Sequence, residues 1–347
     1  MNKAMKMILI LGGIFLLLGA CLFGAAVWMI GGEFDRLSDT VVEQTRYNEP
    51  EGAAFDTVVL DFENSDVQIV FDPESTHLSI DYPLLYSRDG TPKNEVTVTE
   101  TDGSVVIREK IIWYRQWLSW NFTSPKVTVI LPANRTYDLN ICTDNGDINL
   151  DTGDQKYANA PCNTSNVLLE TDNGAIGMID TAVLNCTGHV TCTTANGRIA
   201  LGTVNAARLT AKTDNGEVYL TGGTIGGEAS FTSNNGELRI GGGLTAQHVQ
   251  METDNGAILV GGDVTAEGFV AETDNGNIRI FGSLDAQSIT LISDVGDIYA
   301  DLAASRNDYT VTLTQDTGKS NISSYAGGAR VLTVTTDVGD VEILFVG

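Results

Sequence analysis

Thr253-Asp254-Asn255-Gly256 recurs 20 positions later as Thr273-Asp274-Asn275-Gly276. Three more exact copies and five weaker ones lie between residues 143 and 339. A fixed repeat of this kind is typical of a solenoid, in which each repeat is one structural unit stacked on the last. The glycines of the ten copies are Gly146, Gly174, Gly197, Gly216, Gly236, Gly256, Gly276, Gly296, Gly318 and Gly339.

Apolar residues alternate with polar ones on both sides of each glycine. In one copy they are Val249 and Met251 before Gly256, with Ile258 and Val260 after it. This period of two predicts a strand on each side of the turn, with one face buried. Stacked copies would align these columns at about the 4.8 Å separation of neighbouring strands and form one continuous core.

The tetrapeptide itself predicts a tight turn between the two strands. Asn and Gly tolerate positive φ angles, so we expect the glycine to adopt one. The Thr or Ser three residues before the glycine has inward parity, which predicts a ladder of buried hydroxyl groups. The Asp between them favours an Asx-turn. Coordination of Ca²⁺, which takes six to eight oxygen ligands, is the alternative for this column. The column consists of Asp144, Asp172, Asp214, Asp254, Asp274, Asp294, Asp316 and Asp337.

The pattern extends faintly towards the N-terminus. The same offsets surround Ser65 and Gly103, and Val127, Val129 and Leu131 match half a coil. We therefore predict an irregular N-terminal solenoid part over 55–138 and regular repeats over 139–347. The predicted fold is all-β: a single-stranded parallel β-helix of about 20-residue coils, right-handed by the crossover rule.

The first thirty residues have a different character. Residues 7–30 contain no charge, and about 20 apolar residues suffice for a transmembrane helix. Lys3 and Lys6 predict that residues 1–6 are cytoplasmic, which places the solenoid outside a single-pass anchor in the cell membrane. Residues 31–54 then form a polar juxtamembrane linker with some helix. A lipoprotein attached at Cys21 is the alternative, but the apolar run continues past it to Ile30, which favours an uncleaved anchor.

The charge of the chain limits its partners. The formal net charge is −25, and all 45 acidic residues follow the apolar segment. Such a field repels nucleic acid and anionic lipid, so we expect no nucleic-acid partner. Solubility is the simplest explanation of the acidity.

One aromatic stretch interrupts the coil pattern and provides the candidate binding residues. Its rings would suit stacking against sugars or contact with the bilayer interface. A cap over the open end of the solenoid is the alternative. The candidate binding residues are Trp113, Tyr114, Trp117 and Trp120.

No catalytic, cofactor-binding or metal-binding residue is predicted. The cysteines outside the membrane segment include no Cys-x-x-Cys pair, which argues against zinc. Cys162 and Cys186 fall in nearly the same column of neighbouring coils, so a disulfide between them is a hypothesis. A polysaccharide-acting enzyme would need long loops around a groove, and the repeats after Gly197 leave no room for them.

Four features together indicate a family. They are Ile30-Gly31-Gly32 after the anchor, the opening at Phe55, the segment 127–132 and the Thr-Asp-Asn-Gly series. With them the chain resembles a bacterial family of unknown function, the membrane-anchored β-strand-repeat proteins named "putative adhesins". The resemblance implies a parallel β-helix outside the cell membrane and carries over no catalytic motif.

The predicted function is that of a non-enzymatic surface protein. We expect a binding or scaffold role, with envelope proteins or surface polymers as partners. The first alternative is an accessory or sensory regulator of an envelope-stress system. A polysaccharide-acting enzyme is the least favoured.

Overall fold

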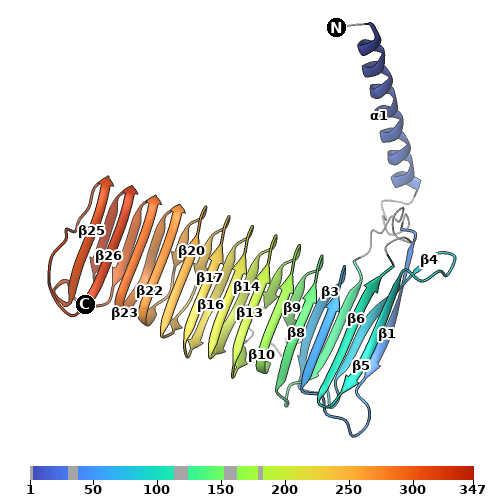
Figure 1. Cartoon of the computed structure of the whole chain (residues 1–347), viewed down its shortest axis with the longest axis horizontal. Coiled ribbons are helices and arrows are strands. Elements are labelled where there is room, and N and C mark those ends of the chain that lie inside the picture. The colour runs from blue at the N-terminus through green and yellow to red at the C-terminus, as the bar shows by residue number, and fades with distance from the viewer. Residues whose placement is uncertain (1–2, 30–37, 113–123, 152–161, 179–182) are drawn as a thin grey trace.

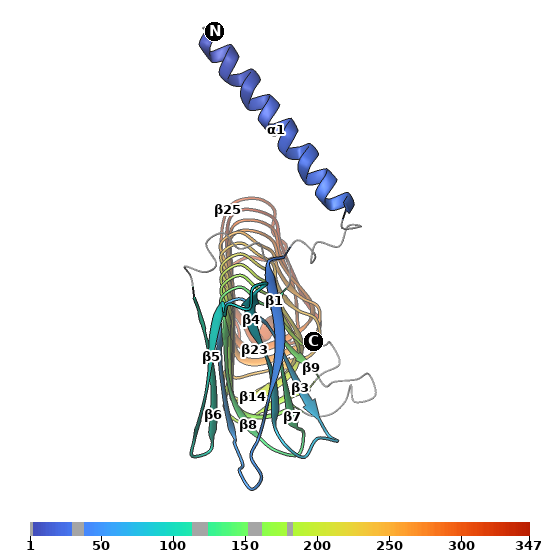
Figure 2. The same ribbon diagram turned by 90° about the vertical axis from the view of Figure 1, so that its right-hand side faces the viewer.

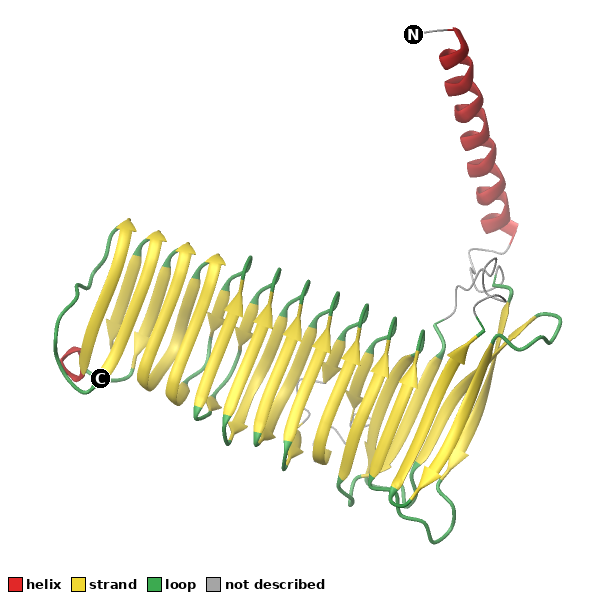
Figure 3. Cartoon of the chain, in the orientation of Figure 1, coloured by secondary structure: helices red, strands yellow, loops and turns green. Residues whose placement is uncertain are grey.

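The computed structural model describes residues 3–29, 38–112, 124–151, 162–178 and 183–347. Within these residues there is one α-helix, α1 (Lys3–Met29), followed by an elongated body of β-strands (Figure 1). The strands run across the long axis of this body and stack from one end to the other (Figure 3). The predicted all-β solenoid is confirmed.

Each coil places one strand before its Asn-Gly turn and one after it, and these form two facing sheets, called here the upstream and downstream sheets (Figure 2). In spatial order the upstream sheet contains β5 (Asn94–Thr101), β6 (Ser104–Ile111), β2 (Thr57–Phe62), β8 (Tyr137–Thr143), β10 (Cys162–Thr171), β13 (His189–Thr194), β15 (Arg208–Thr213), β17 (Glu228–Ser233), β20 (His248–Thr253), β22 (Val264–Asn275), the second half of β23 (Ile278–Val295), β26 (Arg330–Val338) and β25 (Tyr309–Thr317).

The downstream sheet is built in the same way. In spatial order it contains β1 (Thr40–Asn48), β4 (Ser79–Ser87), β7 (Lys126–Pro132), β3 (Asp66–Asp72), β9 (Ile148–Asp151), β11 (Ile176–Met178), β14 (Ile199–Ala206), β16 (Val218–Ile225), β18 (Leu238–Ile240), β21 (Ile258–Val260), the first half of β23, β24 (Ile298–Leu302) and β27 (Val341–Phe345). A short third face carries β12 (Val183–Cys186), β19 (Leu244–Thr245) and the later residues of β14 and β16, and a 3-10 helix (Arg306–Asp308) precedes β25.

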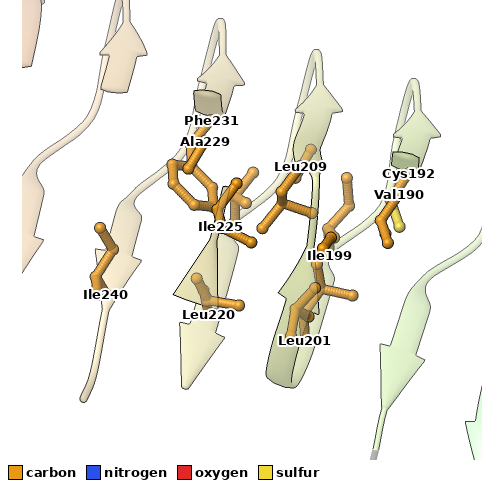
Figure 4. Packing of buried hydrophobic residues seen from close by; sticks show 14 of the residues in the cluster. Val190, Cys192, Ile199, Leu201, Leu209, Leu220, Ile225, Ala229, Phe231 and Ile240 are labelled. Atoms are coloured by element: carbon orange, nitrogen blue, oxygen red, sulfur yellow. The ribbon is translucent and has the colours of Figure 1, made fainter. Parts of the chain in front are cut away.

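Parallel pairing keeps each inward column in register from coil to coil. Val249 pairs with Phe269, and Phe269 pairs with Ile289. All three side chains are buried. Figure 4 shows the same packing in earlier coils, where the side chains of Leu209 and Leu220 lie between the sheets. The predicted core columns are confirmed, and they form one continuous apolar cluster along the body.

The prediction that the repeat glycines hold positive φ angles is wrong. Of the ten, only Gly318 does, at 139°. Glycine is required because stacked turns approach closely. A Cβ placed on Gly256 would lie 2.0 Å from the carbonyl oxygen of Gly236 in the preceding coil, a distance that real Cβ atoms essentially never show. Equivalent collisions occur at the other repeat glycines. The repeat therefore requires glycine at these positions because neighbouring coils approach closely there, and not because φ is positive.

Two hydrogen-bonded ladders join the turns. From Thr171 onward each inward Thr or Ser of the turns donates from its hydroxyl to the carbonyl oxygen of the glycine in the coil stacked before it, as Thr253 Oγ1 does to Gly236 O at 3.0 Å. Thr143 donates to Ser65 O instead, at 3.1 Å. This confirms the buried hydroxyl column, with glycine carbonyls as the acceptors. An exposed amide ladder lies beside it, in which Asn255 Nδ2 donates to Asn235 Oδ1 at 3.2 Å. The amide ladder consists of Asn64, Asn145, Asn173, Asn196, Asn215, Asn235, Asn255 and Asn275.

The N-terminal end departs from a simple solenoid. Strands β2 and β3 stack on the coil of Gly146, as predicted. Around Gly103, however, β5 and β6 form an antiparallel hairpin, and Gly103 has a φ of 75°. In a hairpin as in a coil, apolar and polar residues alternate on both sides of the glycine, so the sequence pattern could not distinguish the two. Residues 40–48, expected in a linker, form β1, which pairs antiparallel with β4.

At the C-terminal end the stacking order differs from the chain order. β26 and β27 stack directly on β23 and β24. β25 precedes them in sequence but pairs with the outer side of β26. The coil of Gly318 is therefore last in space, which corrects the sequential order expected from the repeat. The following loop returns over this edge, where Val311 and Tyr325 exchange two backbone hydrogen bonds.

α1 stands away from the strands, near the end of the body that contains β1 (Figures 1 and 2). Among the residues described well enough to be assessed, no helix is both long enough and apolar enough to cross a membrane.

Candidate binding face

The aromatic residues selected from the sequence, Trp113, Tyr114, Trp117 and Trp120, lie outside the residues that the structure describes. A candidate site must therefore come from the outer surface of the described coils. Outward positions form columns there just as inward positions do, because neighbouring strands pair in register.

The Asp column lies on the edge formed by the turns. Burial raises the pKa of Asp144, and the nearby carboxylates of Asp172 and Asp61 raise it further. Over the described part of the chain, no group of three or more His, Cys, Asp or Glu side chains is placed to hold a metal ion.

Carboxylates one position after the glycine have a clear structural role. Asp147 Oδ1 accepts a hydrogen bond from the backbone N–H of Ala175 at 2.8 Å, and Asp297 Oδ1 accepts one from Asp340 at 2.9 Å. These bonds join one coil to the next. The sequence pattern did not predict these bonds, because they join residues that belong to different coils.

One outward column of the downstream sheet has an unusual composition. The position three residues after the repeat glycine pairs in register across β16, β18, β21, β23 and β24. Phe281 lies two residues beyond this column on β23 and is 58% exposed. We call the six residues the arginine–aromatic stripe: Tyr219, Arg239, Leu259, Arg279, Phe281 and Tyr299.

Aromatic rings lie at both ends of the stripe. The guanidinium carbons of Arg198 and Arg239 are 5.9 and 5.7 Å from the centroid of the Tyr219 ring, within cation–π range. A Cβ on Gly241 would lie 2.7 Å from the Tyr219 hydroxyl oxygen, so this glycine leaves room for the ring to lie along the sheet. At the other end, the ring centroids of Phe281 and Tyr299 are 5.5 Å apart.

The arginines of the stripe differ from others on the surface. Arg198 forms an ion pair with Glu217 at 3.2 Å, and Arg208, on the upstream sheet, pairs with Glu228 at 2.7 Å. Arg239 and Arg279 are exposed, and neither belongs to the ion pairs found among the described residues. Two unpaired cations on a chain of net charge −25 are available to an external anion.

The third face carries a shallow groove of different chemistry. Two hollows of about 460 and 580 Å³ share Asn205 and Thr224 and are lined mainly by Asn, Thr and Gly. Their polar groups are partly satisfied by one another, since Asn205 Nδ2 donates to Asn185 Oδ1 at 3.0 Å.

The disulfide hypothesis is wrong in both the bond and the alignment. Cys162, Cys186 and the other cysteines are free. Cys162 pairs with Leu184, and Cys186 pairs with Thr164, so the two cysteines are offset by two positions. Between the third face and the upstream strand, the coil of Cys186 has one residue more than the coil of Cys162. Counting positions from the repeat glycines therefore did not give the correct register. Burial raises the pKa of both Cys162 and Cys192 to about 12, which keeps them as inert thiols.

Buried polar groups at the N-terminal end serve the fold. Glu49 accepts hydrogen bonds from the backbone N–H groups of Phe55 and Leu78 and from Arg135 Nη1. Burial alone would raise the pKa of Glu49, but these bonds outweigh it and leave the pKa below its usual value. Every donor to this carboxylate is internal, so the cluster joins β1, β4 and β8 and leaves no open ligand position.

Comparison with known proteins gives a family and distant structural neighbours. The model of the Toastrack DUF4097 family matches residues 57–344. No curated protein matches significantly in sequence. Among solved structures, the chain is similar to a "putative adhesin" of Parabacteroides merdae, at 10% identity and a TM-score of 0.41, covering 88% of this chain and 96% of that one.

Two further neighbours have other names. A "putative lipid binding protein" of Parabacteroides distasonis is 15% identical with a TM-score of 0.40, covering 73% of this chain and 94% of that one. A "putative cell adhesion protein" of Clostridium sporogenes is 12% identical with a TM-score of 0.20, covering 88% of this chain and 100% of that one. The family match confirms the resemblance drawn from the sequence.

Proposed function

We propose that this chain, which belongs to the Toastrack DUF4097 family, is a non-enzymatic, membrane-anchored protein that binds components of the cell envelope along its downstream face. The arginine–aromatic stripe carries this proposal. Arg and aromatic residues are the types most enriched among residues that dominate binding energy at interfaces. Here they occupy four of five successive coils, which gives an extended surface rather than a single pocket.

The membrane anchor is part of the proposal and rests on the sequence. Residues 7–30 are uncharged and long enough to cross the hydrocarbon layer. Lys3 and Lys6 would remain on the cytoplasmic side, with the solenoid outside. Mass spectrometry of the protein extracted from membranes should find the native N-terminus. A lipid-modified Cys21 at the N-terminus would replace this anchor by a lipoprotein.

Binding can be tested with the full-length protein in detergent micelles and envelope fragments from the cells that produce it. We expect wild-type protein to sediment with the fragments and Arg239→Glu/Arg279→Glu to lose most of this binding. The control is Arg208→Glu/Lys212→Glu, which makes the same charge change on the outer face of β15. Equal loss in both variants, or no binding by wild type, would count against the proposal.

One observation favours regulation as a second candidate. β1, the first strand after α1, is joined firmly to the solenoid: Arg46 forms two hydrogen bonds with Asp81 at 2.6 and 2.7 Å, and the buried Lys93 bonds Asp39 at 2.8 Å. A firm joint at this point would transmit force or movement towards the membrane. Proximity labelling in intact cells would support this function if it recovered a sensor kinase rather than surface polymers.

A further inference from the structure

We infer that the arginine–aromatic stripe recognises an acidic polysaccharide, a chain of sugar rings carrying carboxylates. This inference rests on the proposed function and names the class of its partner. It follows from three properties of the stripe: its charge, the spacing of its arginines and the placement of its rings.

The charge of the stripe is opposite to that of the molecule. Between Tyr219 and Tyr299 the column itself contains two arginines and no acid. The flanking acids are Glu217, which Arg198 already pairs, and Glu237 in the neighbouring column. At the other end, Tyr299 hydrogen-bonds Asp301 and pairs in register with Glu342, so the positive part of the stripe is confined to Arg239 and Arg279. A planar guanidinium binds a carboxylate through two parallel hydrogen bonds, so each exposed arginine offers one carboxylate position.

The spacing of these positions argues against a peptide bound in β-strand conformation. Arg239 and Arg279 lie on β18 and β23 with β21 between them, which separates their backbones by about 9.6 Å at the usual strand spacing. Side chains on one face of an extended peptide repeat at about 6.4–6.8 Å. Acidic residues of such a peptide, lying along the solenoid axis, would therefore be out of step with the two arginines.

The rings at the two ends provide the second kind of contact. Tyr219 lies over the side-chain-free Gly241, and the exposed Phe281 packs against the half-buried Tyr299. Aromatic side chains combine a large apolar face with little loss of conformational freedom on binding. The apolar faces of sugar rings fit such surfaces. The stripe therefore has two carboxylate positions between stacking positions at its two ends.

Binding to two defined polymers tests the inference. Biotinylated polygalacturonate, a polymer of hexuronic acid, is immobilised for interferometry with the full-length protein in detergent micelles. Poly-glutamate of matched charge and neutral dextran are tested alongside. We expect wild-type protein to bind polygalacturonate at least about tenfold more tightly than poly-glutamate, and dextran not measurably. Arg239→Gln/Arg279→Gln should weaken binding at least about tenfold, since each substitution removes a charged hydrogen-bond donor to a carboxylate.

Matched variants separate the possible outcomes. Arg208→Gln/Lys212→Gln removes the same charge from the upstream face and should change the affinity less than about twofold. Phe281→Ala should weaken binding to polygalacturonate but not to poly-glutamate. The substituted side chains are exposed, so all variants should melt at the wild-type temperature. Poly-glutamate binding as tight as polygalacturonate, or equal loss in the control, would overturn the inference.

The envelope experiment keeps the two proposals distinguishable. If the stripe is needed to bind envelope fragments but polygalacturonate is not bound, the polysaccharide assignment fails and the binding function stands. If neither the fragments nor the polymer bind, both fail.

Discussion

The middle coils and the N-terminal end of this molecule are stabilised in different ways. Between Ile199 and Gly276 every coil repeats the same hydroxyl and amide bonds to its neighbour, so stability is a sum of similar small terms. The N-terminal end has a neighbour on one side only. It relies on contacts that occur once, such as the buried bond between Glu49 and Arg135 at 2.9 Å. A repeat is therefore tolerant of single polar changes and sensitive to anything that separates coils.

The largest expected effect is at a repeat glycine. Gly256→Ala places a Cβ against the backbone of the preceding coil, so we expect a loss of at least about 3 kcal/mol in unfolding free energy. Gly103→Ala is the control from the N-terminal hairpin. There the φ is positive but no atom lies within 4 Å of the new Cβ, and about 1 kcal/mol should be lost. Urea unfolding of the two variants should differ clearly. Similar losses would mean that contact between coils is not the reason for glycine.

The next effect is at the N-terminal cluster. Glu49→Gln removes a buried charge from Arg135 and should cost about 2 kcal/mol at neutral pH. Because the folded-state pKa of Glu49 is lowered, its contribution is present above the unfolded value of 4.5 and is lost as the pH falls through the folded pKa. The variant should therefore lose less stability than wild type on acidification.

Melting curves from pH 7 to pH 3 measure this difference. The exposed Glu267→Gln should behave like wild type, within about 0.5 kcal/mol. Parallel pH profiles for Glu49→Gln and wild type would contradict the role assigned to this carboxylate.

A smaller effect is expected for one step of the hydroxyl ladder. Thr253→Val keeps the shape of the side chain but leaves the carbonyl of Gly236 without its partner, at a cost of about 1–2 kcal/mol. Thr232→Val, at an outward position on β17, is the matched control and should be nearly neutral. Equal losses of unfolding free energy in the two variants would show that the hydroxyl ladder adds no stability beyond side-chain packing.

The smallest effect should be local. Tyr47 on β1 donates a hydrogen bond to Glu100 on β5 at 2.9 Å and so links the edges of the two sheets. Both partners are near the surface, and Tyr47→Phe should cost at most about 1 kcal/mol. Hydrogen exchange should show faster exchange in β1 with unchanged protection in the middle coils. Unchanged exchange throughout would show that the link is not needed to close the end.

Features that depend on the alternation of apolar and polar residues along the chain could be predicted from the sequence. Features that depend on how neighbouring coils stack could not. Inward positions such as Val249 and Thr253 follow from parity alone. The order of the last coils does not, because β25 and β26 carry nearly identical patterns and either could stack on β23. The same limit explains the error at Cys186, whose register depends on one residue that its coil has in excess of the preceding coil. The handedness of the coils stays a prediction.

The candidate site shows the same limit. The sequence drew attention to Trp113 and its neighbours because aromatic residues cluster there within a few positions. Tyr219 and Tyr299 are 80 positions apart in the chain and meet on one face only after stacking. A signal existed: reading the position three after each glycine would have given Tyr, Arg, Leu, Arg and Tyr in succession.

The interleaved ends also constrain the order in which the chain can fold during synthesis. Strands β2 and β3 need β6 and β7 on one side and β8 and β9 on the other, so the first coil synthesised must wait until about residue 151 has emerged. At the far end, β25 must wait for β26, which is made after it. We therefore expect assembly during synthesis to begin once the N-terminal end is complete and to proceed coil by coil, so a chain halted before Arg330 would leave the edge of β23 open.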